Sequence, residues 1–584
     1  MANYLNYGTL AAAIILAAHL RLNNLDWDQG LLTHPDETFV AMVSSKVRLP
    51  HSLYLYLHTA LSPFNPATHG FNFYVYGTLP LAAIRTAADA ANLIGLQQLT
   101  MAGRWISSLL DIFSVLLIYL IGRTLYGIKT GLLAALLLAG TVLHIQHAHY
   151  SVFESWLVFF TLATALSAAN YAVNPKWPFA LLTGLFFGLA VSVKISALHL
   201  APALLIGWML GLRTNVSRGE GARRCITPIL QLSGALATTV AAIRLAYPYA
   251  FVGGSLATPN PLLVKSLSSL ARAATPNPDY PPSVQWHGRH FGFLIENLFF
   301  WGLGPALGTA VIAGVFYSLY ELIFRRRLIH AIPLAACLPL ILYLSGSTVK
   351  PMRYALPALP FLCLAASYLC AKTLRQRNIR IALLVFLPLF TLHFAWAFGF
   401  AAIYSRPFTR YQARQWIVVN APAGATLLQE EWDQRLFFSR AKNEPAFRYE
   451  ALQIFTPDKP EKAGLLSAAL TKADFIVLNS QRGYGSIPRW HERYPLSSGY
   501  YKALFEERLG FKLEKIFTSF PTLLGIERCT FSADESFSVY DHPPVLIFKK
   551  TESLSMEQYA EEIRKATIEN SGQLAIFQEI TCNH

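Results

Sequence analysis

The most regular feature of the chain is a series of long apolar runs separated by short polar segments. A helix that crosses the core of a bilayer needs about 20 mostly apolar residues. The pattern therefore predicts a mainly α-helical, multi-pass membrane protein with about eleven transmembrane helices. The runs are residues 6–22, 105–122, 130–148, 152–173, 178–195, 197–212, 226–246, 293–317, 330–346, 353–371 and 380–403.

Two apolar segments need separate treatment. Residues 73–92 contain Arg85, Asp89 and an early Pro80, which favours an interfacial helix over a twelfth span. The first run lacks a clear basic start, and no small-x-small cleavage motif is followed by a mature domain. We expect the first run to be an uncleaved span.

Lysine and arginine gather in alternate loops. With eleven spans and a cytoplasmic N-terminus, every strongly basic loop falls on the cytoplasmic side, as the positive-inside rule requires. The first loop (23–104), the 148–151 turn, the second large loop (247–292), residues 347–352 and the tail then face outward. The basic residues are Arg123, Lys129, Lys176, Arg213, Arg218, Arg223, Arg224, Arg325, Arg326, Arg327, Lys372, Arg375, Arg377 and Arg380.

After the last apolar run the pattern changes. Alternating stretches such as "DFIVLNS" and "FSVYDHPPVLIFKK" are mixed with helical ones. They predict a small α/β domain over residues 405–584, outside the membrane and distinct from a transmembrane module at 1–404. Cys529 and Cys582 both lie in this tail, but spacing does not fix whether they pair, and no CxxC motif marks a zinc or redox site.

The composition supports a membrane protein. The 584 residues are 54% hydrophobic and 14% charged, against roughly 25% charged residues in soluble domains. The net charge of +15 would suit a nucleic-acid binder. Because the basic residues lie between apolar runs, topology explains them better, and we expect no nucleic-acid partner.

The first outer loop carries the stretch "LLTHPDETFV", with two adjacent acids. One interpretation is a helix start: Thr33 caps a helix that begins at His34, Pro35 suits the first turn, and Asp36 completes a capping-box variant. Capping needs only one acid, so Glu37 stays unexplained. The other interpretation is a general base for a hydroxyl that attacks a sugar carbon. A phosphate leaving group needs no acid, so one carboxylate is enough.

A departing phosphate needs cations or N–H donors. Several basic residues lie on the outer side or just inside the spans, where ionisable groups tend to be functional, although each alone could simply extend to the interface. The preferred pair, Lys350 and Arg353, shares the short loop "STVKPMRYALP". The candidates are Arg104, Lys194, Arg244, Arg289, Lys350 and Arg353.

A second polar group flanks the outer turn in "HAHYSVFESW". For His149 a satisfied polar contact is favoured over catalysis. Glu154 could bind an acceptor sugar, orient Asp36 or ligate a metal together with His144, His147 or His149, but the spacing demands no metal, and we expect no cofactor. Aromatic residues in loop 276–301 fit either sugar stacking or an interfacial belt.

In order along the chain, "HPDE", "NFYVYGTLPL", "GRTLYG", "HAHYSVFESWLVFF", "VKISAL", "PPSVQWHGR…ENLFFWGLGPALG", "RYALPALPFL" and "VYDHPPVLIFKK" form a set. This set resembles the family-39-like, phospholipid-carrier-dependent glycosyltransferases of the GT-C superfamily, relatives of protein O-mannosyltransferases and lipid A aminoarabinose transferases. The "HPDE" loop also resembles that of eukaryotic mannosyltransferases of lipid-linked glycan and GPI assembly.

The resemblance implies a GT-C fold, an outer active site, a polyprenyl-phosphate sugar donor and inversion at the anomeric carbon. It maps the catalytic acids onto Asp36 and Glu37, with Asp36 as the base, and His34 into the substrate site. Related sequences carry Asp where this chain has Glu154. The monosaccharide-transferring relatives suggest a metal-independent reaction.

The main alternative function is a transporter or flippase of lipid-linked or envelope substrates. Transporters also bury charges, but they often show internal repeats, and no repeat of halves is visible here. A structural envelope protein would leave the acid pair and the cations unexplained. We therefore expect a multi-pass enzyme of the cytoplasmic membrane, with a glycan, a lipid or a protein as acceptor and the sugar left open.

Overall fold

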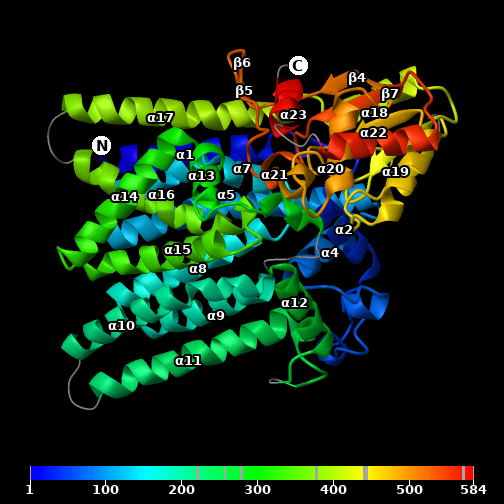
Figure 1. Cartoon of the computed structure of the whole chain (residues 1–584). Coiled ribbons are helices and arrows are strands. Elements are labelled where there is room, and N and C mark those ends of the chain that lie inside the picture. Colours follow the sequence, from blue (N-terminus) through cyan, green and yellow to red (C-terminus); the bar gives the residue numbers. More distant parts are fainter. Residues whose placement is uncertain are drawn as a thin grey trace.

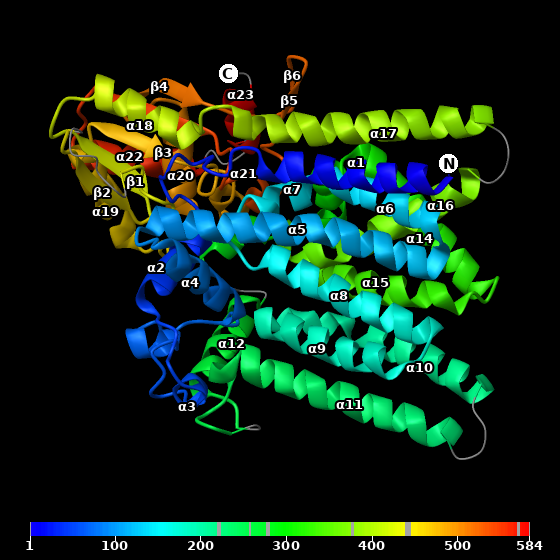
Figure 2. The ribbon, with the colours of Figure 1, turned by 180° about the vertical axis from the view of Figure 1, so that it is seen from behind.

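The chain forms a bundle of long helices with a smaller α/β unit at one end (Figure 1). The computed structural model describes residues 2–218, 223–255, 258–275, 281–374, 379–437, 445–568 and 573–582. Of the basic residues assigned to inner loops, Arg375 and Arg377 lie outside these ranges. The same bundle is seen from behind in Figure 2, where α17 (Ile379–Ala401) and α1 (Ala2–Leu22) lie along one side and α11 (Arg223–Ala246) lies along the other.

The apolar runs of the sequence are helices. The other bundle helices are α5 (Leu96–Tyr126), α6 (Ile128–Ala139), α7 (Val142–Ala148), α8 (Glu154–Val173), α9 (Trp177–Val193), α10 (Ala201–Arg218), α13 (Phe293–Asn297), α14 (Pro305–Ile323), α15 (Ala331–Gly346) and α16 (Leu359–Leu374). A π-helical turn, Leu298–Gly302, follows α13, and a 3-10 segment, Met352–Ala358, precedes α16.

Fewer helices than the expected eleven meet the length and apolarity of a full span. Among the described residues eight do, or nine if α6 and α7, bent by 61° relative to each other, form one broken span. Helix α9 is a shorter apolar helix of 17 residues. Residues 73–92 contain only the 13-residue α4 (Leu79–Ala91), which is too short for a twelfth span, as expected.

The break between α6 and α7 is held by buried charges. Carbonyls at the end of α6 lose their helical partners at this bend, and the Arg21 guanidinium donates to Leu138 and Ala139. Arg21 also pairs with Asp111 at 2.6 Å, and Asp111 accepts a hydrogen bond from His144. Since all three side chains are buried, this network fixes α1 and α5 against the bend.

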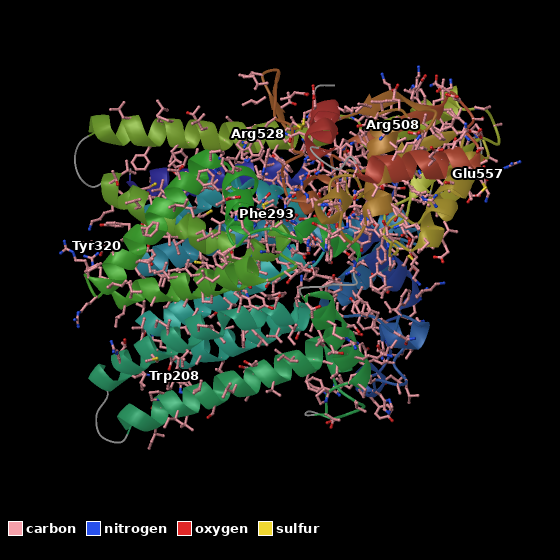
Figure 3. All side chains as sticks on the ribbon, viewed as in Figure 1. Trp208, Phe293, Tyr320, Arg508, Arg528 and Glu557 are labelled. Carbon is pink, nitrogen blue, oxygen red and sulfur yellow. A yellow bond between two sulfur atoms is a disulfide. The ribbon has the colours of Figure 1, made fainter. Side chains whose placement is uncertain are left out.

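The loops with the candidate acids lie at one end of the bundle. The first loop forms α2 (Pro35–Lys46), α3 (Leu53–Leu57) and α4, and the second forms α12 (Pro261–Ala273). In both views these helices lie at the same end as the C-terminal α/β unit, and the N-terminus lies at the other (Figures 1 and 2). Tyr320, near the end of α14 and just before Arg325–Arg327, lies at that other end (Figure 3).

The C-terminal unit is built on a five-stranded sheet of order β2-β1-β3-β7-β4. β1 is parallel to β2 and β3, whereas β7 is antiparallel to β3 and β4. The strands are β1 (Thr426–Glu430), β2 (Arg448–Leu452), β3 (Phe475–Leu478), β4 (Phe511–Phe517) and β7 (Val545–Lys550), with a separate hairpin of β5 (Thr522–Leu523) and β6 (Ile526–Glu527).

Both faces of the central strands β1, β3 and β7 are largely buried. Alternate residues of β3 point to opposite faces: Phe475 packs with α18 and Ile476 with α19, α20 and α22. This explains why "FIVL" is apolar at every position.

Cys529 and Cys582 form a disulfide. The helices are α18 (Thr409–Asn420), α19 (Pro460–Lys472), α20 (Pro495–Phe505), α21 (Glu535–Ser538), α22 (Met556–Ile568) and α23 (Gln573–Cys582).

Candidate functional site

The acid pair lies in the first turn of α2. The expected Thr33 cap is wrong: the helix begins at Pro35, His34 occupies the N-cap without a side-chain cap bond, and the Thr33 hydroxyl is buried without a partner. Pro35 takes the first helical position, as its missing N–H favours. Because consecutive helical residues point in directions about 100° apart, Asp36 and Glu37 face different surroundings.

Glu37 points into the protein. Its two carboxylate oxygens accept hydrogen bonds from Arg104 Nε at 2.8 Å and Nη2 at 2.7 Å, and one also accepts the Ser151 N–H. Arg104 further pairs with Asp28 at 3.0 Å and lies over the Trp27 ring. Glu37 is 0% exposed. Burial raises the pKa of Glu37, and the paired guanidinium opposes that rise.

Asp36 points to an accessible surface. Its Oδ2 accepts a hydrogen bond from Arg353 Nη1 at 2.8 Å, and the Asp36 side chain is 33% exposed. Arg353, 16% exposed, lies in the 3-10 segment before α16. The ion pair therefore joins the first loop to the end of a span and leaves a carboxylate open to a ligand.

A second ion pair lies beside the first. Lys194, which follows α9, contacts Glu154 at the start of α8 at 3.3 Å. The ammonium also lies 4.6 Å from the centre of the Tyr354 ring. Glu154 interacts electrostatically with Arg353 and Asp36. Two cations and two carboxylates from four separate segments thus form one site cluster: Asp36, Glu154, Lys194 and Arg353.

Two buried histidines with unused nitrogens border the site cluster. His34 and His147 each have both ring nitrogens buried without a hydrogen-bond partner. The His34 ring stacks on Tyr540 at 3.9 Å between centroids. Burial, with help from Arg353, lowers the pKa of His34 well below its usual range, so the imidazole is neutral at pH 7 and can donate or accept one hydrogen bond to a bound ligand.

Arg244 and Lys350, two other candidate cations, donate hydrogen bonds to backbone carbonyls. Arg244 donates to the carbonyls of Pro248, Leu57 and Gly253, which ties the first and second loops together. Lys350 donates to Ser345 at 3.0 Å, near the end of α15, and to Arg289 at 3.3 Å. Of the preferred pair of cations, only Arg353 reaches Asp36.

Arg289 lies apart from the site cluster, over the Phe293 ring, and its Nε is buried without a partner. The ring nitrogens of His149 lie within hydrogen-bonding distance of two backbone carbonyls, Ile145 and Asn23, of which a neutral ring can bond one, and the ring stacks on Tyr404 at 3.7 Å between centroids. This is a polar contact of the kind that the sequence favoured. Within the ranges that the structure describes, no three His, Cys, Asp or Glu side chains are placed to hold a metal ion.

Sequence reasoning missed the aromatic wall of this site. Tyr76 and Tyr540 both interact electrostatically with Asp36 and Arg353. Their stretches, "NFYVYG" and "VYDHPP", carried the family resemblance, yet nothing in their spacing pointed toward the acids. Arg21 and Asp111 were also missed, although an unpaired charge inside an apolar run is a signal for a buried partner.

Comparisons with known proteins bear on the fold and on one segment. Residues 90–247 match the family model described as dolichyl-phosphate-mannose-protein mannosyltransferase. This segment contains Arg104, Glu154, Lys194 and Arg244. No curated protein matches the chain significantly.

Solved structures cover most of the chain. The Archaeoglobus fulgidus oligosaccharyltransferase tethered to an acceptor peptide is 16% identical, with a TM-score of 0.53 over 90% of this chain and 74% of that chain. The same enzyme with zinc and sulfate is 17% identical, with a TM-score of 0.50 over 87% and 72%. ArnT from Cupriavidus metallidurans bound to undecaprenyl phosphate is a weaker likeness, 12% identical, with a TM-score of 0.42 over 71% and 73%.

The fold is therefore that of a multi-pass GT-C membrane protein with a small C-terminal sheet unit, as expected. The fold along most of the chain and the family match over residues 90–247 agree with the resemblance to the GT-C superfamily that the sequence motifs indicate.

Proposed function

We propose that the chain is a membrane glycosyltransferase that moves a sugar from a polyprenyl-phosphate carrier to an acceptor hydroxyl, with inversion at the anomeric carbon. The observation that carries this proposal is the Asp36 carboxylate, one third exposed and paired with Arg353, next to the Lys194–Glu154 pair. A base and cations for a leaving phosphate are thus side by side.

In this mechanism the acceptor hydroxyl gives its proton to Asp36 as its oxygen attacks the anomeric carbon. The bond between that carbon and the phosphate oxygen breaks, and its electron pair stays on the phosphate. The products are a new glycosidic bond, protonated Asp36 and a polyprenyl phosphate that needs no protonation. One base therefore suffices, unlike the two carboxylates of a glycosidase.

Arg353 and Lys194 are the cations for the departing phosphate. Both lie near the ends of apolar helices, where a lipid carrier would present its headgroup. Charge that develops on the phosphate strengthens these contacts in the transition state. Glu154 holds Lys194 in place, and the neutral His34 offers one hydrogen bond to a sugar or phosphate oxygen. Glu37 and Arg104 then act as positioning residues, because both are buried and paired.

We place the reaction on the outer face of the cytoplasmic membrane, with the N-terminus in the cytosol. Two features support this orientation. Disulfides persist in oxidising compartments, and the Cys529–Cys582 disulfide lies in the C-terminal unit. Arg325–Arg327 follow α14 at the opposite end of the bundle, where the positive-inside rule favours the cytosol. Residues 405–584 then form an extracytoplasmic domain.

The donor class is supported by the family match, whose description names a dolichyl-phosphate sugar. The acceptor is a glycan, a lipid or a protein.

The test compares cells that carry the wild-type protein with cells that carry Asp36→Asn, by mass spectrometry of lipid-linked sugars and envelope glycans. We expect one polyprenyl-phosphate sugar to accumulate, one glycan to disappear, and the transfer rate to fall by about 10²–10⁴-fold. Asp89→Asn is the matched control, since Asp89 also pairs with an arginine of the first loop but lies outside the site cluster. Normal transfer by Asp36→Asn would refute the proposed base.

A further inference from the structure

A cavity opens between the start of α2 and the C-terminal unit. It has a volume of about 220 Å³. We call it the Trp432 cavity; its lining residues are Thr33, Pro35, Arg410, Trp432, Asp433, Gln434, Arg482, Val539 and Tyr540. Pro35 precedes the proposed base in the chain, and Tyr540 lies against His34 and interacts electrostatically with Asp36 and Arg353. The cavity therefore reaches Pro35, the residue before the proposed base, and is lined by Tyr540, which contacts His34.

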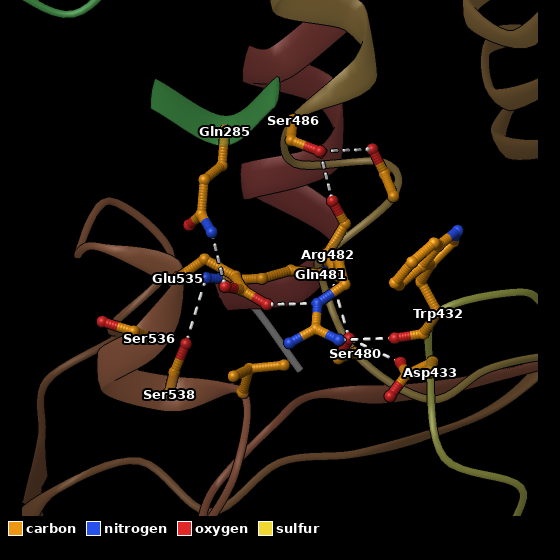
Figure 4. A network of polar contacts seen from close by, with 12 residues as sticks. Gln285, Trp432, Asp433, Ser480, Gln481, Arg482, Ser486, Glu535, Ser536 and Ser538 are labelled. Carbon is orange, nitrogen blue, oxygen red and sulfur yellow. Dashed lines mark hydrogen bonds and ion pairs between the residues drawn. The ribbon is translucent and has the colours of Figure 1, made fainter. Parts of the chain in front are cut away.

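The cavity has a rigid polar lining. Arg410 donates to Asp433 at 2.7 Å, and Asp433 also accepts from the Ser480 hydroxyl at 2.6 Å. Arg482 is fixed between Glu535 and the carbonyl of Trp432, and Gln285 from the second outer loop bonds the same glutamate (Figure 4). These contacts pre-organise the hydrogen-bonding groups of the cavity.

The charges of the two arginines and one aspartate of the lining are balanced by Glu535, which does not itself line the cavity. Each arginine has a carboxylate partner: Arg410 pairs with Asp433 at 2.7 Å, and Arg482 pairs with Glu535 at 2.6 Å. A phosphate or acidic ligand would need uncompensated cations. A neutral ligand with several hydroxyl groups, in contrast, can use carboxylate, amide and guanidinium groups at once.

Trp432 gives the cavity an apolar face. Its side chain is 48% exposed, and its backbone has a φ of +66°, a conformation that bulky residues rarely adopt. Such strain persists where the surrounding structure imposes it, and it gathers at functional sites. In Figure 4 the indole extends away from the carbonyl that receives Arg482. An exposed indole provides a flat surface for the C–H face of a sugar ring.

One group in the lining lacks a partner. The Thr33 hydroxyl is buried, and no hydrogen bond satisfies it. An unsatisfied buried hydroxyl is costly, which points to a ligand that completes it. The volume of about 220 Å³ lies below the roughly 300–1,000 Å³ of pockets for drug-sized ligands, so the cavity suits one small polar ring.

We infer that the Trp432 cavity binds a neutral sugar unit of the acceptor, which makes the acceptor a glycan and not a peptide. The inference rests on the proposed function, in which the acceptor hydroxyl reaches Asp36. The sugar ring stacks on Trp432, its hydroxyls bond Asp433, Gln434 and Thr33, and the nucleophilic hydroxyl points past Pro35 toward the carboxylate.

The test is a binding measurement that needs neither donor nor catalysis. The full-length protein in nanodiscs is titrated with a panel of neutral methyl glycosides and, separately, with serine- and threonine-containing peptides. We expect saturable binding of at least one glycoside at concentrations up to roughly 10 mM. Trp432→Ala should weaken it about tenfold, and Trp432→Phe should weaken it less because a ring remains.

Two further variants separate binding from folding. Thr33→Val removes an unsatisfied hydroxyl, so it should not lower the melting temperature, yet it should weaken glycoside binding about fivefold. Trp177→Ala, which removes a half-exposed indole at the start of α9, should bind normally. Binding by no glycoside, equal binding by wild type and Trp432→Ala, or Trp432-dependent binding of peptides alone would overturn the inference. None of these outcomes depends on Asp36→Asn, which tests the proposed function separately.

Discussion

Two adjacent carboxylates of α2 lie in opposite environments. Glu37 is enclosed with Arg104 and Asp28, whereas Asp36 shares a partly open surface with Arg353, Glu154 and Lys194. Both acids are paired with arginine at hydrogen-bonding distance, so pairing alone does not distinguish them. Exposure does: 0% for Glu37 against 33% for Asp36.

The difference in exposure suits Glu37 to a structural role and Asp36 to a chemical one, within one helical turn. A fully buried ion pair is costly to break, because the remaining charge has no solvent. It suits a clamp that joins α2, α5 and the turn before α8. A partly exposed pair costs little to separate, and this suits a carboxylate that must exchange its partner for a substrate hydroxyl.

The largest expected effect on stability comes from removing the clamp. Arg104→Met leaves Glu37 and Asp28 buried without a cation, and we expect the free energy of unfolding to fall by at least roughly 3–5 kcal/mol. Thermal unfolding of the purified protein measures it. Lys472→Met, which breaks an exposed pair with Glu450, is the control and should cost less than about 1 kcal/mol. Equal losses in the two variants would contradict the clamp.

Substitution of each acid in turn separates the structural role of Glu37 from the chemical role of Asp36. Glu37→Gln should lower the free energy of unfolding by roughly 3 kcal/mol, since Arg104 keeps only one carboxylate. Asp36→Asn should change it by less than about 1 kcal/mol while it abolishes most transfer. Melting temperature and transfer rate are measured on both variants. If Asp36→Asn melts as early as Glu37→Gln, the two acids share a structural role.

A third prediction concerns Lys194, the second cation of the partly exposed site cluster. Lys194→Gln keeps a polar side chain but removes the charge, and the inhibition constant for added polyprenyl phosphate should rise about ten- to hundredfold. Arg244→Gln is the control, because Arg244 bonds only carbonyls in the described part of the chain. An unchanged constant for Lys194→Gln would remove it from the phosphate site.

A third carboxylate shows what burial does without a cation. Glu430, in β1, accepts the Tyr501 hydroxyl, and burial raises the pKa of Glu430 to about 8. The native state then holds a proton that the unfolded state releases near pH 4.5, so stability should fall as the pH rises from about 4.5 to about 8. Glu430→Gln should remove this slope, which unfolding at about pH 5.5 and about pH 8.5 would show. A slope that survives the substitution would assign it to another group.

Much of the fold could be predicted because the membrane constrains the length and apolarity of each span, and both can be read from the local sequence. A span must be long and apolar, and runs such as 105–122 and 353–371 meet this rule without knowledge of their neighbours. The rule overestimated full spans where helices are short or bent, as in α9 and at the α6–α7 break. It also missed that Arg21 would close that break, because the partner carbonyls lie 117 and 118 positions away.

The residues of the candidate site could be predicted in part. The "HPDE" motif indicated the acids, and basic residues near the span ends indicated the cations. Which cation pairs with which acid could not be assigned, because Arg353 contacts Asp36 across 317 positions and Arg104 contacts Glu37 across 67. The sequence by itself determined a multi-pass membrane protein with ionisable groups beside its spans, since apolar length and charge are local properties. Only the tertiary structure decided which acid is open and which is enclosed, because exposure depends on what the rest of the chain packs against each side of a helix.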